Sequence, residues 1–430
     1  MRASFKKAIA NLPVLANIKL VNWLPLLFAV WLLLSITMPV SIYRAFFHVL
    51  IYPFTLYLVS HQYNRIIWKD AFIRIFITFC GYMAITTWLV GDDTLAGDIR
   101  AVRWSIEAAL GMLAYWIWMQ SVVVYSRLWG RGLLFLAGAG ACAGLLSSLA
   151  DISVNARIGG LGMMGQHPIQ GASISITLLA VGLFLTHANQ QAVNRNDIIF
   201  TFLSIIAVCT FVALSQSRAP QVTLLGYLIF FGLLISYQYR RPATFYLIGG
   251  VFVAILLAIH GLIGFDLLYE QFKERGTSYR IEIWTAVFNH PPESLLLGHG
   301  AGLDFRLTDA AKIDLNDLGF EVYHPHNIWL GAFMDTGIIG VVMQAGLLVL
   351  PLIAILRNAL RIENKLHLLV ILGLFVLLTL TDEYTLLISP HPIWLIGWIP
   401  LVFVWSWCRY KDDAQENFLQ THACARGQSL

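Results

Sequence analysis

Long apolar runs alternate with short polar segments along most of the chain, and one polar stretch, at residues 265–325, is much longer than the others. A membrane-spanning helix needs about 20 predominantly apolar residues, and most of the runs approach this length. The pattern therefore predicts twelve transmembrane helices, at about 21–40, 45–60, 71–90, 104–124, 132–150, 171–187, 198–214, 222–238, 244–264, 328–356, 367–381 and 393–408.

These runs predict an all-α polytopic membrane protein with one large loop subdomain. The predicted parts are 1–264 with helices one to nine, 265–325 as the large loop, 326–408 with helices ten to twelve, and 409–430 as a tail. The basic segment Met1–Lys19 precedes the first run, and no small-residue cleavage site follows it. We therefore interpret the first run as an uncleaved span.

The positive charges are unequally divided between the two faces that these helices define. With the basic amino-terminal segment inside and an even number of spans, both ends of the chain lie on the inner face. Inner segments then carry 18 of the 28 Lys and Arg residues, and outer segments carry 10. This bias follows the positive-inside rule, so we expect cytoplasmic termini and a large loop on the outer face.

The composition agrees with a membrane protein. Only 12% of the residues are charged, against about 25% in soluble domains, and the mean hydropathy is +0.71. The net charge of +4 adds little to this picture. The five cysteines show neither a disulfide framework nor metal-ligand spacing, so we interpret them as small hydrophobic residues: Cys80, Cys142, Cys209, Cys408 and Cys424.

Two histidines stand where the large loop gives way to the tenth predicted helix, in the segment His324-Pro325-His326-Asn327. Pro325 suits the first turn of a helix, which would place His326 in that turn as well. The positive end of the helix dipole would then keep the imidazole neutral and able to accept a proton. The alternative is an interfacial histidine that binds a loop carbonyl.

Two glycines follow on the same predicted helix. Gly337 lies eleven residues after His326, which is three turns on the same helical face, and Gly340 lies one turn further. Small residues at this spacing would let a neighbouring helix approach closely. Such an approach would fix the direction in which the histidine points.

Four arginines in outer segments run against the charge bias: Arg157, Arg218, Arg275 and Arg280. Each could pair with an outer carboxylate or reach the lipid headgroups. Together with the histidine they favour an anion site, because planar guanidinium groups bind phosphate oxygens with two parallel hydrogen bonds. Asp382 and Glu383 could orient His326 or an arginine, or could be solvated loop charges.

The large loop contains one segment with helical periodicity, Ser278–Phe288, which is expected to end near His290 and the two prolines that follow. Gly298-His299-Gly300 predicts a tight turn. The loop histidines lack the helical spacing of a zinc site, so no metal is expected.

The chain resembles the bacterial O-antigen ligases, within the wider O-antigen ligase and polymerase superfamily of membrane glycosyltransferases. The ligase signature is His followed by Asn, Ser or Gln, then nine residues, then Gly-x-x-Gly. His326-Asn327 and Gly337-Ile338-Ile339-Gly340 fit this spacing, and Ser217-Arg218 and Arg280…Trp284…Gly298-His299-Gly300 resemble the superfamily pattern. The resemblance covers about 150–380. Gln166-His167-Pro168 departs from the expected Asn-Pro pair, which leaves a role for His167 in doubt.

The resemblance implies a metal-independent, inverting transfer of polysaccharide from undecaprenyl diphosphate to a hydroxyl of the lipid A–core oligosaccharide. It implies that His326 is the general base, that Arg218, Arg280, Arg157 and Arg275 bind the diphosphate, and that Asn327, Gly337, Gly340 and His324 support the site. The protein would lie in the bacterial inner membrane among its lipids, with the site and the large loop facing the periplasm. No cofactor and no nucleic-acid partner are expected.

Other functions remain open from the sequence. An O-antigen polymerase or a protein O-oligosaccharyltransferase would use the same lipid-linked donor and differ in the acceptor. A transporter or flippase of an anionic lipid-linked solute belongs to a different class. It predicts arginines and broken helices near the bilayer midplane and a repeat between the two halves, and the sequence shows no evident repeat.

Overall fold

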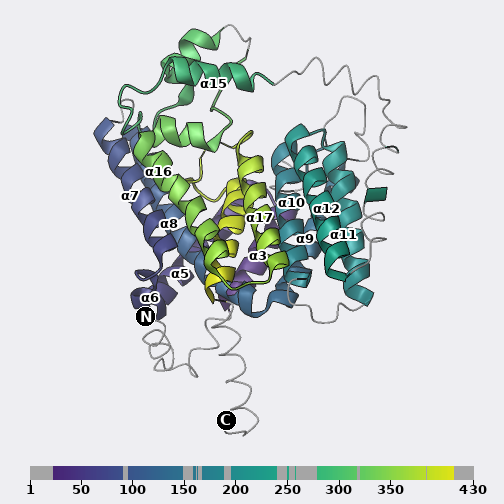
Figure 1. Cartoon of the computed structure of the whole chain (residues 1–430). Helices are drawn as coiled ribbons and strands as arrows, with labels where there is room; N and C mark the ends of the chain where they lie inside the picture. Colours follow the sequence, from purple (N-terminus) through teal and green to yellow (C-terminus); the bar gives the residue numbers. More distant parts are fainter. Residues whose placement is uncertain are drawn as a thin grey trace.

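The structure is a computed structural model. It describes residues 23–90, 95–148, 158–160, 162, 167–187, 195–239, 249–250, 257, 278–316, 320–383 and 385–410. All regular secondary structure in these ranges is helical, as predicted (Figure 1). The α-helices that build the bundle are α3 (Trp23–Thr37), α4 (Val40–Phe46), α5 (Tyr52–Leu58), α6 (Asn64–Ile67), α7 (Ala71–Val90), α8 (Leu95–Val124), α9 (Ser126–Ser147), α10 (Pro168–His187), α11 (Arg195–Leu214), α12 (Arg218–Tyr239), α16 (Ile328–Arg357) and α17 (Ile362–Thr379).

Within the described ranges, nine helical stretches are long and apolar enough to cross a membrane. One of them, Val40–Tyr63, contains α4 and α5, which the π-helical turn η1 (Phe47–Ile51) joins, and ends with a second π-helical turn, η2 (Val59–Tyr63). The shorter apolar helix α3 is a tenth element, and residues 392–410 form a further helix around the π-helical turn η7 (Trp394–Trp398). The predicted run at 244–264 lies almost wholly outside the described residues, so the count of twelve stays a prediction.

The helix boundaries differ from the predicted ones mainly at one end of each element. The longest extension is in α8, which begins at Leu95 instead of about 104 and carries charged residues in its first turns. Hydropathy alone places a boundary at the first charged residue, whereas a helix continues through charges that find partners at the membrane surface. The helix α15 (Arg280–Asn289) confirms the helix predicted in the large loop, and it ends at His290 as expected.

Glycines allow the closest helix contacts in the bundle. The helix α9 packs against both α10 and α11. A Cβ atom added at Gly182 of α10 would lie 3.0 Å from the backbone nitrogen of Leu134 and 3.1 Å from the carbonyl oxygen of Gly130 on α9. Small residues thus bring two membrane helices together where apolar lipid supplies no hydrophobic driving force.

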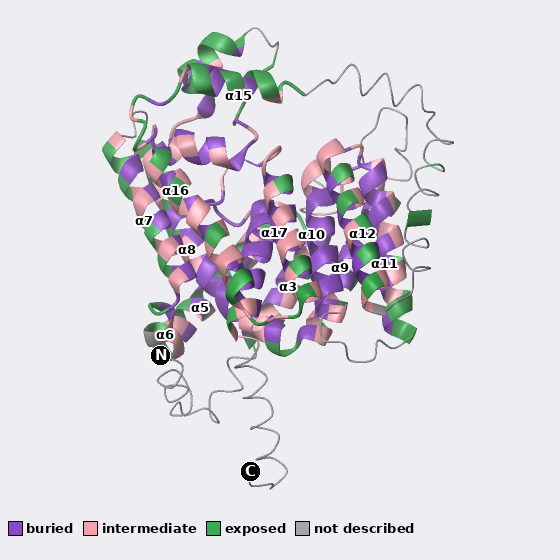
Figure 2. Cartoon of the chain, viewed as in Figure 1, coloured by how far each residue is buried: buried purple, intermediate pink, exposed green. Residues whose placement is uncertain are grey.

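Large aromatic side chains fill the core where α3, α8 and the last helix meet. Phe28 stacks on Trp118 with ring centroids 4.6 Å apart, and Trp394 stacks on Trp398 at 4.0 Å. All four side chains are buried. Figure 2 shows buried residues gathered in the middle of the bundle, around α10 and α17. Several of the chain's many aromatic residues therefore belong to the packed core.

The segment 278–327 lies over one end of the bundle, where Figure 1 shows α15. It also contains the short turns η4 (Phe305–Leu307) and η5 (Ala310–Asp314). Its small apolar core joins Ile283, Ala286 and Val287 of α15 to Leu330 and Met334 at the start of α16. This shared core fixes the segment to the helix whose first residue follows His326 and Asn327. We call this end of the bundle the site end and the opposite end, at the start of α7 and α11, the far end.

Candidate functional site

His326 lies just before α16 and not in its first turn, so that part of the prediction is wrong. The helix begins at Ile328, and the side chain of Asn327 caps it by accepting hydrogen bonds from the backbone N–H groups of Trp329 at 2.8 Å and Leu330 at 3.3 Å. His326 itself has a left-handed backbone with φ of 52°. A residue with a side chain adopts this conformation at a cost of about 1–3 kcal/mol, so the surrounding structure must hold it there.

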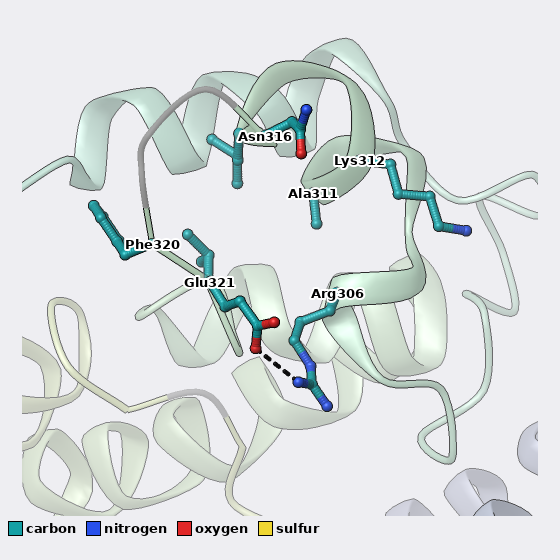
Figure 3. Close-up of a pocket in the computed structure, with 8 residues that line it drawn as sticks. Arg306, Ala311, Lys312, Asn316, Phe320 and Glu321 are labelled. Atoms are coloured by element: carbon teal, nitrogen blue, oxygen red, sulfur yellow. Dashed lines mark hydrogen bonds and ion pairs between the residues drawn. The ribbon is translucent and has the colours of Figure 1, made fainter.

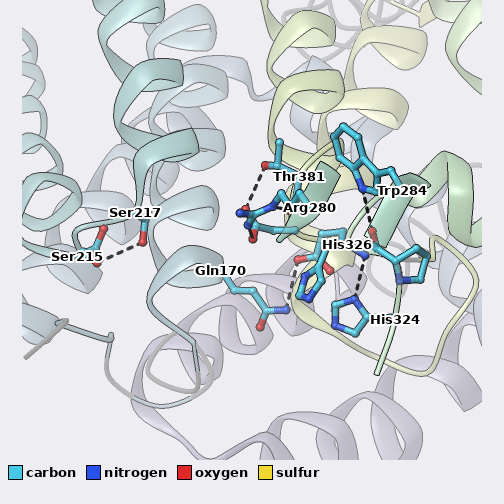
Figure 4. Close-up of polar contacts among 11 residues, drawn as sticks. Gln170, Ser215, Ser217, Arg280, Trp284, His324, His326 and Thr381 are labelled. Atoms are coloured by element: carbon cyan, nitrogen blue, oxygen red, sulfur yellow. Dashed lines mark hydrogen bonds and ion pairs between the residues drawn. The ribbon is translucent and has the colours of Figure 1, made fainter. Parts of the chain in front are cut away.

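His324 and Trp284 hold the histidine segment in place (Figure 4). The rings of His324 and His326 lie 4.1 Å apart between centroids, and Nδ1 of His324 accepts a 3.3 Å hydrogen bond from the backbone N–H of His326. The indole Nε1 of Trp284, on α15, donates a 3.0 Å hydrogen bond to the carbonyl of Pro325. Hydrogen bonds thus hold the segment 324–326 both internally, through His324, and to α15, through Trp284.

The imidazole of His326 is neutral near neutral pH, as predicted, but the main cause is burial. Burial, together with smaller contributions from the positive charge of Arg280 and from the neighbouring His167, lowers the pKa of His326 to about 4. Burial likewise lowers the pKa of His324 to about 3, with contributions from His326, His391 and His167. Nδ1 of His326 is buried and has no hydrogen-bond partner in the part of the chain that the structure describes. The ring is therefore uncharged and partly unsatisfied.

Arg280 is the first residue of α15. It is one of the predicted arginines, and it lies close enough to His326 to lower the pKa of that imidazole. Its guanidinium forms an ion pair with Asp382 and donates from Nε to the carbonyl of Thr381 (Figure 4). Asp382 therefore orients an arginine and is not a solvated loop charge. The pair fixes the guanidinium beside His326 and balances part of its positive charge.

Glu383 is also no solvated loop charge, since only 2% of it is exposed. Burial and the negative charge of Asp382 raise its pKa to about 8, although a hydrogen bond from Gln170 opposes the shift. Nε2 of Gln170, at the start of α10, lies 3.3 Å from the Glu383 carboxyl. The carboxyl group is therefore protonated at neutral pH, and it ties α10 to the segment that follows α17.

The two glycines of α16 do not form the predicted helical stripe beneath His326. The helix breaks at Gly337, whose φ of 64° and ψ of −166° are outside the range that side chains readily adopt. An added Cβ at Gly337 would lie 2.3 Å from the carbonyl of Leu296, so the close neighbour is a loop backbone and not a transmembrane helix. At Gly340 the closest side-chain atom belongs to Thr336, on the preceding turn, and an added Cβ would also lie 3.3 Å from the ring of Phe79 on α7, so a neighbouring helix does approach closely at this glycine.

The turn around Gly298 fills the break in α16. The backbone N–H groups of His299 and Gly300 donate to the carbonyls of Met334 and Asp335 at 2.7 and 3.0 Å, and Ile338 donates to Leu295 at 2.9 Å. These bonds satisfy backbone groups that the break would otherwise leave unpaired. The predicted tight turn is confirmed by positive φ angles at Gly298 and Gly300, and it fastens the large loop to the site helix.

The other predicted site residues have different outcomes. Arg218 is the first residue of α12, next to the turn that contains Ser215 and Ser217 (Figure 4). Arg157 and Arg275 lie outside the described residues. His167, whose role was in doubt, lies close enough to His324 and His326 to lower the pKa of both.

Three residues at the site end were not predicted: Arg44, His391 and Gln170. Arg44 was counted only as an outer arginine, and Gln170 lies in an apolar run, so neither carried a local signal. His391 lies between Pro390 and Pro392. It is close to His324 in the structure, although the two residues are about 70 positions apart in the sequence. Only the folded chain brings them together.

No group of three or more His, Cys, Asp or Glu side chains within the described ranges has a geometry that could hold a metal ion. The histidines are close to one another, but their nitrogens do not converge on one point together with a carboxylate. The chemistry that this arrangement supports is proton acceptance by a neutral imidazole beside a guanidinium.

A separate pocket of about 390 Å³ lies in the large loop (Figure 3). Its lining includes Arg306, Lys312, Phe320 and Glu321, and none of the predicted site residues. Arg306 donates to Glu321 at 2.8 Å and to Asp304 at 2.6 Å, so two carboxylates balance its charge. This pocket is distinct from the histidine site, and its lining mixes charged side chains with the apolar Ala311, Leu315 and Val322.

The fold and site define a polytopic helical membrane protein with a buried proton acceptor and a guanidinium at one end of its bundle. Residues 202–345 match the family model described as O-Antigen ligase. A curated relative from Pseudomonas aeruginosa, named O-antigen ligase, is 29% identical over 169 residues, which cover 38% of this chain and 40% of the relative. The chain thus matches less than half of that relative's length. The resemblance to this family of membrane glycosyltransferases is confirmed, and the matched region contains Arg218, Arg280, His326 and both α16 glycines.

Proposed function

We propose that the protein is an O-antigen ligase that transfers a polysaccharide from undecaprenyl diphosphate to a hydroxyl of the lipid A–core oligosaccharide. The observation that supports this most directly is the neutral, buried imidazole of His326, held beside the guanidinium of Arg280. The family match over residues 202–345 supports the donor and acceptor classes.

The proposed reaction is a direct displacement at the anomeric carbon. The acceptor oxygen forms a bond to this carbon while the bond to the diphosphate oxygen breaks, and the diphosphate leaves with the electron pair. His326 accepts the hydroxyl proton, a role that typically contributes about 10²–10⁴-fold to a rate. Because no protein nucleophile intervenes, the anomeric configuration inverts.

Arg280 stabilises the charge that develops on the diphosphate. Its ion pair with Asp382 positions the guanidinium before substrate binds. Arg218, Arg157 and Arg275 remain proposed diphosphate ligands, supported by their place in the sequence. Guanidinium groups would supply the positive charge that the leaving group needs, so the proposed mechanism is metal-independent and requires no cofactor.

The proposed location is the bacterial inner membrane, with the site end and the large loop facing the periplasm and both termini in the cytoplasm. The support is the charge distribution, since the far end carries Arg127, Arg131 and Arg195. The proposed division remains twelve spans, with nine within 1–264 and three within 326–408, a periplasmic loop at 265–325 and a tail at 409–430.

A polymerase or a protein O-oligosaccharyltransferase would share the donor site and differ in the acceptor. The ligase signature of His326-Asn327 and Gly337…Gly340 and the name of the matched relative favour the ligase. A transporter of an anionic solute would bind and release that solute without a chemical change. This function would not explain why a neutral proton acceptor lies at the site.

The test is transfer by purified protein supplied with undecaprenyl-diphosphate-linked glycan and lipid A–core, with product followed on gels and its anomeric configuration by NMR. We expect His326→Ala to lower the rate about 10²–10⁴-fold with an unchanged melting temperature. His290→Ala, in the exposed part of the same loop, is the matched control and should transfer normally. Normal transfer by His326→Ala would exclude the general-base role, and a product made only from two lipid-linked chains would identify a polymerase.

A further inference from the structure

Arg44, on α4, lies at the site end, and among the described residues one hydrogen bond engages its guanidinium. Its Nε donates a 2.9 Å hydrogen bond to the carbonyl of Pro390, the residue before His391. A guanidinium has five N–H donors, and this bond uses one of them. The bond holds the planar group in a fixed place and leaves its two terminal nitrogens available to a ligand.

The charge of Arg44 is not balanced in the part of the chain that the structure describes. The nearby carboxylate of Glu107, on α8, instead lies 3.0 Å from Nε2 of His48 and 3.5 Å from Nε of Arg103. Arg280 differs in this respect, because Asp382 forms an ion pair with it. Of the two arginines beside the histidines, Arg44 therefore attracts an anion with less competition from the protein.

A row of neighbouring side chains connects Arg44 to His326. Arg44 lies close enough to His391 to help lower its pKa to about 3, although burial is the larger cause. His391 in turn affects His324, whose ring is 4.1 Å from that of His326. The backbone N–H of Ile393 donates to Nδ1 of His391 at 3.3 Å, which fixes that ring. Arg280 affects His326, at the other end of this row.

The geometry of displacement assigns the two arginines to different substrates. In an inverting transfer the attacking hydroxyl and the leaving diphosphate lie on opposite sides of the anomeric carbon. Arg280 is the arginine next to His326 in the proposed diphosphate site, whereas Arg44 lies beyond His324 and His391. A separate cation at that position suits the acceptor, which must be held so that its hydroxyl reaches the general base.

We propose that Arg44 binds an anionic substituent, a phosphate or a carboxylate, of the acceptor glycolipid. This inference rests on the proposed ligase function for the identity of the acceptor. Planar guanidinium groups bind both kinds of anion with two parallel hydrogen bonds, a geometry that lysine cannot supply. The site positions the acceptor and takes no part in proton transfer.

The experiment compares Arg44→Gln and Arg44→Lys with Arg103→Gln, an arginine of the same end whose carboxylate partner is known. Steady-state transfer is measured with each substrate varied in turn, and melting temperatures verify folding. We expect the acceptor KM to rise tenfold or more in both Arg44 variants, with donor KM and kcat within about threefold of wild type. Arg103→Gln should leave all three values near wild type.

The source of the anion is identified by repeating the measurement with lipid A–core whose phosphates have been removed. If Arg44 binds a phosphate, the wild-type protein should have a higher KM for this acceptor, and the Arg44→Gln substitution should raise that KM no further. If the substitution still raises the KM as it does with the phosphorylated acceptor, the group is a carboxylate and the proposal holds. A rise in donor KM alone, or equal effects in Arg103→Gln, would overturn it, because Arg44 would then bind the diphosphate, lipid headgroups or nothing specific.

A binding measurement separates this inference from the proposed function. Fluorescently labelled lipid A–core is titrated into wild-type and Arg44→Gln protein in nanodiscs, with no donor present. If the wild-type protein transfers no glycan but binds the acceptor at least tenfold more tightly than the variant, only the ligase assignment fails. Equal affinity in the two proteins overturns the role of Arg44, whatever the activity.

Discussion

Two sets of buried polar side chains, the carboxylates Asp70 and Asp197 at the far end and the histidine segment at the site end, differ in how far their hydrogen bonds are satisfied. At the far end, Asp70 accepts hydrogen bonds from the indoles of Trp116 at 3.1 Å and Trp405 at 3.0 Å and from the phenol of Tyr410 at 2.7 Å. Asp197 binds both Arg127 and Arg131 at 2.5 Å. Every acceptor oxygen there has a donor, so these carboxylates join helices and have no capacity left for a ligand.

At the site end, polar groups are buried without full satisfaction. Among the described residues, Nδ1 of His326 has no hydrogen-bond partner, and Arg44 forms no ion pair with a carboxylate. A buried polar atom without a partner costs about 1–3 kcal/mol. The satisfied carboxylates connect helices, whereas Nδ1 of His326, beside a guanidinium, can still accept a hydrogen bond from a substrate. An unpaired atom alone does not mark a site, because both ring nitrogens of His187, at the far end, are also buried without a partner among the described residues.

The largest expected effect comes from the two adjacent acids after α17, which have opposite roles. Asp382→Asn removes the ion pair that positions Arg280, and we expect transfer to fall about 10²-fold because a displaced catalytic group loses its alignment. Glu383→Gln should stay within a few-fold of wild type, since the pKa of about 8 already keeps that carboxyl protonated at neutral pH. Measured kcat/KM values for the two variants check this, and equal losses would remove the distinction.

The second-largest effect concerns Asp70 at the far end, where both carboxylate oxygens accept hydrogen bonds. Asp70→Asn keeps the shape but weakens acceptance from two indoles and one phenol, and we expect a loss of about 1–3 kcal/mol in the free energy of unfolding. Thermal unfolding in detergent measures the loss, and kcat at a temperature well below the transition should remain that of wild type. A large fall in kcat with no change in melting would mean that Asp70 serves the reaction.

The smallest effect is a displacement of the pH profile. His326 must be neutral to accept a proton, and its pKa of about 4 lies below the ordinary value of 6.5. As pH falls, kcat/KM should therefore persist through pH 5.5 and decline only near pH 4. Arg280→Gln removes a positive charge that lowers this pKa, so its residual activity should decline at a higher pH. An acid limb near 6.5 in the wild-type protein would contradict the burial of the ring.

The sequence by itself determined the helical membrane class, because apolar runs of this length can satisfy their backbone in lipid only as helices. It also singled out His326-Asn327, the Gly337…Gly340 pair and Arg280 as candidate site residues, and residues 202–345 are similar to the family that this pattern suggested. It indicated a neutral imidazole, though it attributed that state to the helix dipole instead of burial.

Tertiary structure decided which groups meet. The break at Gly337, the loop that fills it, the pairing of Arg280 with Asp382 and the row from Arg44 to His326 all join segments distant in the chain. A local sequence pattern indicates the type of one helix, whereas these contacts depend on how separate helices pack. Burial sets the charge of His326, and a side chain becomes buried only when the helices have packed.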